Sequence, residues 1–270
     1  MFIYRDPGSE GATLIPQASH AWLAWQVAEH WGNRRISRPA PRAEVLAAVL
    51  LHDSGWTEFD RDPGLDPDGR PPAFDSMPVA DHLAIWRESV NRAALHSRYA
   101  GLLVAAHFRR LAAFKSVDSG APERAGGRLV GEFCEAMAAL EEGWVVALSD
   151  DPRAAPFVKP APLRANQLLL AFCDRLSVHL CAGLAGDFSL PVAAADGSDT
   201  VVRVTPLGGG RWRLSPWPLE GAELRVHCEA RRPGSTTFED RETLRSALER
   251  APVERLSFTL LRPSRAGRVG

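Results

Sequence analysis

The stretch VLAAVLLHDSGWTEFD, residues 45–60, decides how this chain can fold. Its run of small and aliphatic residues predicts a buried helix that ends near Gly55, and the run leads directly into His52 and Asp53. An imidazole and a carboxylate beside so apolar a segment would cost several kcal/mol if they had no partner. A metal ion is the best partner for such an adjacent pair, so this stretch predicts a buried metal site.

Helical spacing of apolar residues continues on both sides of this stretch. It predicts helices over 17–32, 79–96, 99–114, 123–149 and 163–184, the fourth with a break at Gly143. Residues 60–78 are rich in Asp, Pro and Gly and predict a long loop. Because long loops without structure of their own are often functional, we expect this one to act as a lid.

The pattern changes after Gly186, where apolar and polar residues alternate in short segments separated by Gly and Pro. We therefore expect a mainly α fold, a helical bundle with a small C-terminal antiparallel β unit. Residues 1–185 would form the helical metal-binding domain, with short strands within 2–16. Residues 186–270 would form the β-rich unit, packed on the helices and supplying no metal ligand.

Composition excludes several classes of function. Lys and Arg number 32 against 33 for Asp and Glu, and this balance argues against a nucleic-acid or anionic-membrane partner. No apolar run is long enough for a membrane span, and the N-terminus has no signal-peptide pattern. The four cysteines form no CxxC pair, so a disulfide framework is not expected. We expect a cytoplasmic protein with a small-molecule substrate, and the oligomeric state stays open.

Five of the predicted helices each carry an imidazole or a carboxylate on the apolar face or at the end of the helix. The candidate metal ligands are His20, His52, Asp53, His82, His107 and Asp174. A single core histidine is more often hydrogen-bonded than metal-bound, and a single buried aspartate usually pairs with an arginine or the backbone. The coincidence of so many, including a contiguous His-Asp pair, favours a site for Fe, Mn or Zn.

The order His, His-Asp, His, His, Asp along a helical chain resembles the HD-domain superfamily of metal-dependent hydrolases, over roughly residues 17–182. That resemblance implies one metal held by His20, His52, Asp53 and Asp174. It also implies that His82 and His107 match the extra histidines of members with two metals, in which Asp53 bridges the ions and is the candidate catalytic residue.

Several segments resemble a narrower group within that superfamily, the bacterial domain of unknown function DUF3891. The similar segments are QASHAWLAWQVAEHWGN, LHDSGWTEFD, FDSMPVADHLAIW, LLVAAHF, FCDRLSVHLC and, in the C-terminal unit, SPWPL. This resemblance implies the same metal site. It implies no reaction, because the group is itself uncharacterised.

One position departs from the HD pattern. Many HD hydrolases have Gly-Lys after the pair, and the lysine can contact phosphate, whereas this chain has Ser54-Gly55-Trp56. Phosphate contacts would have to come from arginines. The candidate substrate-binding residues are Trp56, Asp60, Arg109, Arg110 and Arg175.

Three functions remain open from the sequence. The first is hydrolysis of a phosphoester or nucleotide-like small molecule through a metal-activated water, with two divalent ions. The second is an HD-type di-iron oxygenase that acts on a small polar substrate, because the superfamily includes such enzymes with this ligand set. The third is a non-catalytic ligand-binding or regulatory module.

Overall fold

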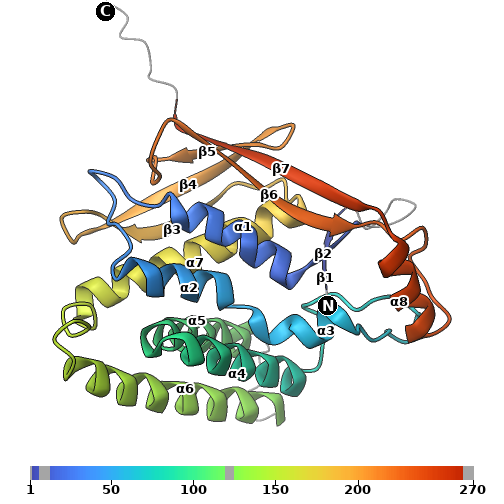
Figure 1. The fold of residues 1–270 in the computed structure, drawn as a ribbon, viewed down its shortest axis with the longest axis horizontal. Coiled ribbons are helices and arrows are strands. Elements are labelled where there is room, and N and C mark those ends of the chain that lie inside the picture. The colour runs from blue at the N-terminus through green and yellow to red at the C-terminus, as the bar shows by residue number, and fades with distance from the viewer. Residues whose placement is uncertain (1, 6–12, 119–124, 264–270) are drawn as a thin grey trace, which may run out of the picture.

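A layer of helices packs against one seven-stranded sheet (Figure 1). The structure is a computed structural model that describes residues 2–5, 13–118 and 125–263. Within this part the helices are α1 (Gln17–Glu29), α2 (Arg42–Leu51), η1 (Ser54–Trp56), α3 (Thr57–Arg61), α4 (Val79–His96), α5 (Arg98–Asp118), α6 (Ala125–Ser149), α7 (Pro160–Ala182) and α8 (Arg241–Arg250). Helices α1 and α7 lie next to the sheet, α4 and α5 lie beyond them, and α6 is outermost.

The sheet combines strands from both ends of the described chain. Its order is β1-β2-β6-β7-β5-β4-β3. The strands are β1 (Phe2–Arg5), β2 (Thr13–Pro16), β3 (Phe188–Ala193), β4 (Asp199–Gly208), β5 (Arg211–Ser215), β6 (Glu223–Arg231) and β7 (Val253–Leu261). Neighbours are antiparallel except β5 and β7, which are parallel, so the sheet is mixed.

The expected mainly α fold class is therefore wrong, and the protein is α+β. Strand β2 pairs with β6 through Leu14 and Arg231, so the N-terminal strands extend the sheet that was expected to be only C-terminal. The pairing links residues too distant in sequence for local patterns to reveal it. The division of the chain at residue 185 stays a prediction.

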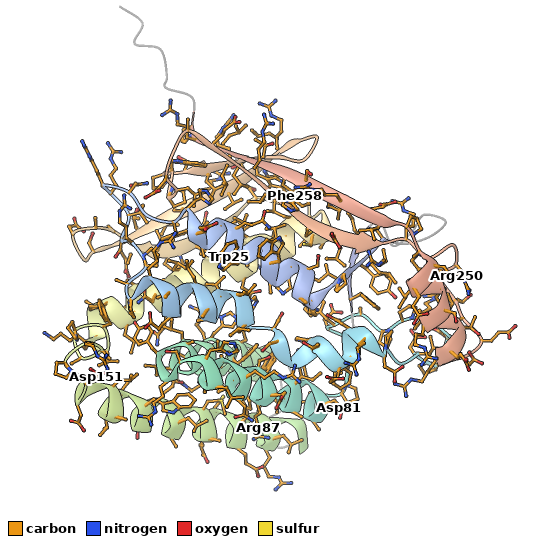
Figure 2. The ribbon with its side chains drawn as sticks, in the orientation of Figure 1. Trp25, Asp81, Arg87, Asp151, Arg250 and Phe258 are labelled. Atoms are coloured by element: carbon orange, nitrogen blue, oxygen red, sulfur yellow. The ribbon has the colours of Figure 1, made fainter. Side chains whose placement is uncertain are left out.

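Side chains from the sheet and from α1 and α7 fill a shared core. Phe258 on β7 is buried on the face toward the helices, and Trp25 of α1 packs against the same core (Figure 2). Exposed charged side chains such as Asp81, Arg87 and Arg250 lie on the outside of the helices. Helix α7 is buried along most of its length. It therefore forms a fixed element on which a site can be built.

Several helix boundaries differ from the sequence prediction. Helix α1 ends at Glu29 instead of residue 32, and α2 ends at Leu51, just before the His-Asp pair. Helix α6 runs through Gly143 without a break. The turn expected between the N-terminal strands lies outside the described residues. No helix in the described ranges combines the length and apolar character that crossing a bilayer requires.

Candidate metal centre

The predicted ligands come from separate elements that converge on one region of the helical layer. They are His20 on α1, His52 and Asp53 between α2 and η1, His82 on α4, His107 on α5 and Asp174 on α7. Helix packing, rather than sequence proximity, brings them together. Helices α1 and α7 pack on each other, and both contact α2.

The turn that carries His52 and Asp53 packs very closely on α4, and Gly55 permits this approach. A Cβ atom added at Gly55 would lie 2.2 Å from the backbone oxygen of Ile85. The backbone N–H of Gly55 donates a hydrogen bond of 2.9 Å to Ser89 Oγ. The glycine two residues after the His-Asp pair is therefore needed to hold the pair in place.

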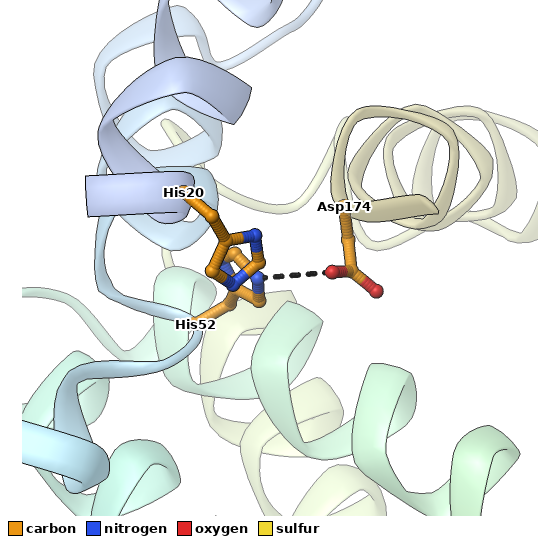
Figure 3. A group of neighbouring side chains, drawn as sticks. All are labelled: His20, His52 and Asp174. Carbon is orange, nitrogen blue, oxygen red and sulfur yellow. Dashed lines mark ion pairs between the residues drawn. The ribbon is translucent and has the colours of Figure 1, made fainter. Parts of the chain in front are cut away.

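His20, His52 and Asp174 form the tightest group of potential metal ligands among the described residues. One ligand atom from each lies within 4.8 Å of the others. Figure 3 shows the two imidazoles facing the Asp174 carboxylate, with His52 Nε2 3.4 Å from Asp174 Oδ1. Both histidine side chains are only 1% exposed. This group could hold a metal ion.

Hydrogen bonds on the far side of each ring fix the orientation of His20 and His52. His52 Nδ1 lies 2.7 Å from the carbonyl oxygen of Val49 and donates to it, since a carbonyl can only accept. The Ser177 hydroxyl donates to the Asp174 carbonyl oxygen, so it accepts from His20 Nδ1 at 2.9 Å. In a neutral ring both Nε2 atoms then present lone pairs to the cluster, as metal-binding histidines do.

Asp53 and His107 extend the group. Asp53 Oδ2 lies 2.7 Å from His20 Nε2 and 3.8 Å from His52 Nε2. His107 Nε2 lies 3.3 Å from Asp174 Oδ2. Each carboxylate therefore contacts two imidazoles, and the five side chains form one continuous cluster.

Three buried ring nitrogens in this cluster lack the partner that buried polar atoms normally have. His52 Nε2 and both nitrogens of His107 make no hydrogen bond with any described residue, because the nearby carboxylate oxygens do not meet hydrogen-bond geometry. A buried polar atom without a partner costs roughly 1–3 kcal/mol. A cation would satisfy His52 Nε2, His107 Nε2 and the two carboxylates together, so the donor set fits a metal.

The charges of the cluster support the same reading. Burial alone would lower the pKa of His52, but Asp53 and Asp174 outweigh it and raise that pKa to about 9. Burial alone would raise the pKa of the Asp174 carboxyl, yet the His107 and His52 imidazoles hold it well below its usual range. The space between these side chains thus favours a positive charge, which a proton or a metal ion can provide.

His82 lies apart from the closest group, in an aromatic environment. Its ring centroid is 4.5 Å from that of Trp86 and 5.2 Å from that of Trp56. His82 is nearly fully buried and lines the same pocket as His52 and His107. Its role as a ligand, like that of His107, stays a prediction.

A pocket of about 580 Å³ opens onto the cluster. His52, Asp53, His82, His107 and Asp174 contribute to its wall, whereas His20 lies behind them. Aromatic side chains form much of the remaining wall: Trp56, Phe74, Trp86, Phe108 and Phe172. Phe74 and Asp75 come from the 60–78 loop, so that loop contributes to the pocket. Whether it opens and closes as a lid stays a prediction.

The predicted substrate-binding residues divide into two sets. Trp56, Arg110 and Arg175 line the pocket. Arg109 instead forms a two-bond ion pair with Glu141 of α6, at 2.6 and 2.9 Å. Asp60 accepts hydrogen bonds from the backbone N–H groups of the first two residues of α1. The structure therefore places Arg109 and Asp60 in structural contacts rather than in the pocket wall.

Comparison with known protein families supports one assignment. Residues 2–232 match the family described as "Protein of unknown function (DUF3891)". The chain belongs to the DUF3891 family. No curated protein and no solved structure gives a match. None of these comparisons links the DUF3891 chain to the HD-domain superfamily.

The DUF3891 match spans every residue of the cluster and its pocket but ends before α8 and β7. The sequence did not single out Ser177, which orients His20. It also did not single out Phe74 and Asp75, which line the pocket. A hydroxyl three residues after Asp174, in an otherwise apolar helix segment, was the available signal for Ser177. Nothing in the loop sequence marked Phe74 as a pocket residue.

Proposed function

We propose that this DUF3891 protein is a metal-dependent hydrolase of the HD type that acts on a phosphoester or nucleotide-like small molecule. One observation carries the proposal. A buried His-Asp cluster with unpartnered nitrogens shares a pocket with Arg110 and Arg175, neither of which forms an ion pair with a described residue. Cation ligands and free guanidinium groups in one pocket suit an anionic substrate.

The residues that would hold the metal are those of the cluster. His20, His52 and Asp174 with Asp53 would hold one divalent ion of Fe, Mn or Zn, and His82 and His107 would complete a second site. When bound, the metal would supply Lewis acidity and lower the pKa of a water molecule, making hydroxide available near neutral pH.

The chain itself would bind and orient the substrate. Arg110 lies close enough to Asp174 for their charges to interact, so a phosphate beside it would also lie beside the cluster. Arg175 follows Asp174 directly and lines the same pocket. The two guanidinium groups would offset the negative charge of the phosphate, the role that a lysine has in many HD hydrolases.

A second function has one observation in its favour. The pocket wall is largely apolar and aromatic, and Trp56 stands where many HD hydrolases have lysine. A less charged substrate would suit such a wall, as in a di-iron oxygenase of the HD type. A non-catalytic binding module with the same cluster is the third candidate.

The test begins with metal analysis of protein purified without oxygen. We expect bound Fe, Mn or Zn in the wild type, loss of metal in Asp174→Ala, and wild-type metal content in His227→Ala, a control on β6 outside the pocket. Phosphate release from p-nitrophenyl phosphate should follow metal content across the three proteins. Dioxygen consumption without phosphate release would favour the oxygenase. Bound metal with neither activity would favour the binding module, and absence of metal would contradict all three metal-based readings.

A further inference from the structure

We infer that the pocket takes an amphipathic substrate, an organic phosphomonoester whose apolar body lies along the pocket surface formed by α7 and β3. This inference names the substrate class of the proposed hydrolase and rests on that function. It differs from the nucleotide-like reading because the surface next to the phosphate position is apolar.

One face of α7 supplies both the polar and the apolar parts of the pocket. Leu168, Ala171 and Val178 share this face with Asp174 and Arg175, at spacings of three and four residues. Because a helix rises about 1.5 Å per residue, Leu168 lies about 9 Å along the axis from Asp174. An apolar group of several carbon atoms can therefore lie along α7 while its head remains at the cluster.

Strand β3 completes the apolar wall. Leu190 and Pro191 line the pocket opposite α7, although they belong to the sheet. Leu190 is only partly buried, so part of its side chain is accessible to a ligand. Its neighbour Ser189 is exposed and does not line the pocket. The sheet thus contributes an apolar surface to a site whose candidate metal ligands all come from the helical layer.

The head group should be an anion because the pocket wall holds two arginines that are available to form an ion pair. Arg109, next to Arg110, is paired with Glu141. Arg110 and Arg175 form no ion pair with a described residue. Arg110 is half-buried, and burial outweighs the nearby Asp174 charge to lower its pKa. A phosphate would form the ion pairs that these two guanidinium groups lack among the described residues.

The aliphatic part of the wall argues against a ribose or a base at this position. The residues between α7 and β3 are aliphatic, and none of Leu168, Val178, Leu190 and Pro191 offers a side-chain hydrogen bond to a ribose or a base. Polar hydroxyls on this surface would lose water without gaining a partner. An alkyl or aryl group would gain from burial on the same surface.

The test uses phosphonates, which resist hydrolysis, and measures their binding to the protein as purified by titration calorimetry. We expect hexylphosphonate to bind on the order of tenfold or more tightly than methylphosphonate, because of the extra buried carbon atoms. Hexanol should bind weakly because it lacks the anion. Equal affinity for hexyl- and methylphosphonate, or tighter binding of AMP than of hexylphosphonate, would overturn the inference.

Matched variants locate the two ends of the ligand. Leu190→Thr should remove most of the advantage of hexyl- over methylphosphonate, whereas Ser189→Thr, which places threonine at the exposed neighbouring position outside the pocket wall, should keep it. Arg175→Gln should weaken both phosphonates several-fold, and Arg213→Gln, at an exposed position on β5, should weaken neither. An unchanged hexyl advantage in Leu190→Thr would overturn the placement on β3.

The outcomes separate this inference from the proposed function. Phosphate release from methyl phosphate and hexyl phosphate at equal efficiency would support a hydrolase and contradict the apolar-body assignment. Selective binding of hexylphosphonate, with neither bound metal nor phosphate release, would contradict the hydrolase while leaving the ligand class supported.

Discussion

Ser177 shows how a residue outside the ligand set can control the candidate site. Its hydroxyl accepts from His20 Nδ1 and donates to the backbone of Asp174, so it links two potential ligands. Groups in this position hold the ring orientation and the tautomer that a metal needs. The effect of removing the hydroxyl should therefore appear in metal affinity before it appears in folding.

For Ser177→Ala we predict a loss of metal affinity of roughly 10- to 100-fold, the range typical of such supporting residues. Competition with a chromogenic chelator measures it. Ser189→Ala, at an exposed position on β3, serves as the control and should bind metal like the wild type. Wild-type affinity in a folded Ser177→Ala protein would show that His20 needs no such support.

Asp53 and His82 should differ in their importance for metal content. Asp53 Oδ2 contacts two imidazoles, while His82 lies among aromatic rings at the pocket wall. We predict that Asp53→Ala loses at least one ion, because the carboxylate that would lie between the cations is gone. The His82→Ala variant should retain most of its metal. Elemental analysis measures the metal content of both purified variants, and circular dichroism checks that they are folded. Full metal retention in folded Asp53→Ala would make His52-Asp53 a structural pair.

Much of the candidate cluster could be predicted from sequence, because each residue is a polar exception on an apolar helix face. The neighbouring arginines could not be separated in this way. Arg109 and Arg110 differ by one step of about 100° around α5, since a helix has 3.6 residues per turn. Which of the two points into the pocket depends on Glu141 on α6, which pairs with Arg109. A partner so distant in the chain cannot be recognised from the sequence around Arg109.

At the scale of elements, the close contact between the Gly55 turn and α4 determines where the His-Asp pair lies. The turn has no room for a side chain, because the neighbouring atoms of Ile85 and Ser89 belong mostly to the α4 backbone. A backbone neighbour cannot rotate away as a flexible side chain can. Any substitution must therefore move the turn, the helix or both.

We predict that Gly55→Ala lowers the melting temperature by roughly 5 °C, since overpacking costs about 1–3 kcal/mol and each kcal/mol shifts the melting temperature by about 2–4 °C at this size. It should also reduce metal content. Gly143→Ala in α6 is the matched control, because a Cβ atom there meets no other atom within 4 Å. Alanine favours the helix, so this control should be neutral or slightly stabilising. Equal melting temperatures for Gly55→Ala and the wild type would show that α4 can move to accommodate the added methyl group.

The sequence predicted the helices better than their ends. Apolar spacing located α4 over the expected residues, yet α1 ends at Glu29 and not at Gly32. The residues after Glu29 turn toward the connection between β5 and β6, where the N–H of Gly32 donates to the carbonyl of Pro218. That tertiary contact, which no propensity records, replaces the last helical hydrogen bonds.

At the scale of the whole molecule, strand β7 holds the sheet together. It lies between β6 and β5, although the family match ends at residue 232 and β7 begins at Val253. Leu260 and Phe258 on β7 are buried in the core. Without β7, the sheet would divide into two parts with an unpaired edge on each.

We therefore predict that a chain ending at residue 232 does not fold to a soluble monomer, even though it contains every candidate ligand. Expression in the soluble fraction and size-exclusion chromatography measure this. A chain ending at residue 263 keeps all described strands and should behave like the full chain. A soluble and cooperatively melting 1–232 chain would show that β7 is dispensable.

The fold class could not be predicted because the sheet depends on pairings between distant segments. Alternation after Gly186 predicted strands there, and short apolar segments predicted strands near the N-terminus. No local pattern indicated that Leu14 would lie opposite Arg231, or that β5 and β7 would run parallel. Local patterns predict elements, whereas pairing depends on how the helices between them pack.

The central place of β7 has a consequence for synthesis of the protein on the ribosome. Translation produces β5 and β6 before β7. Each of these two strands therefore has an unpaired edge until residues 253–261 leave the exit tunnel. During that interval the nascent chain exposes two strands able to pair with other chains. Holding chaperones should therefore bind this chain mainly late in elongation and release it once β7 enters the gap.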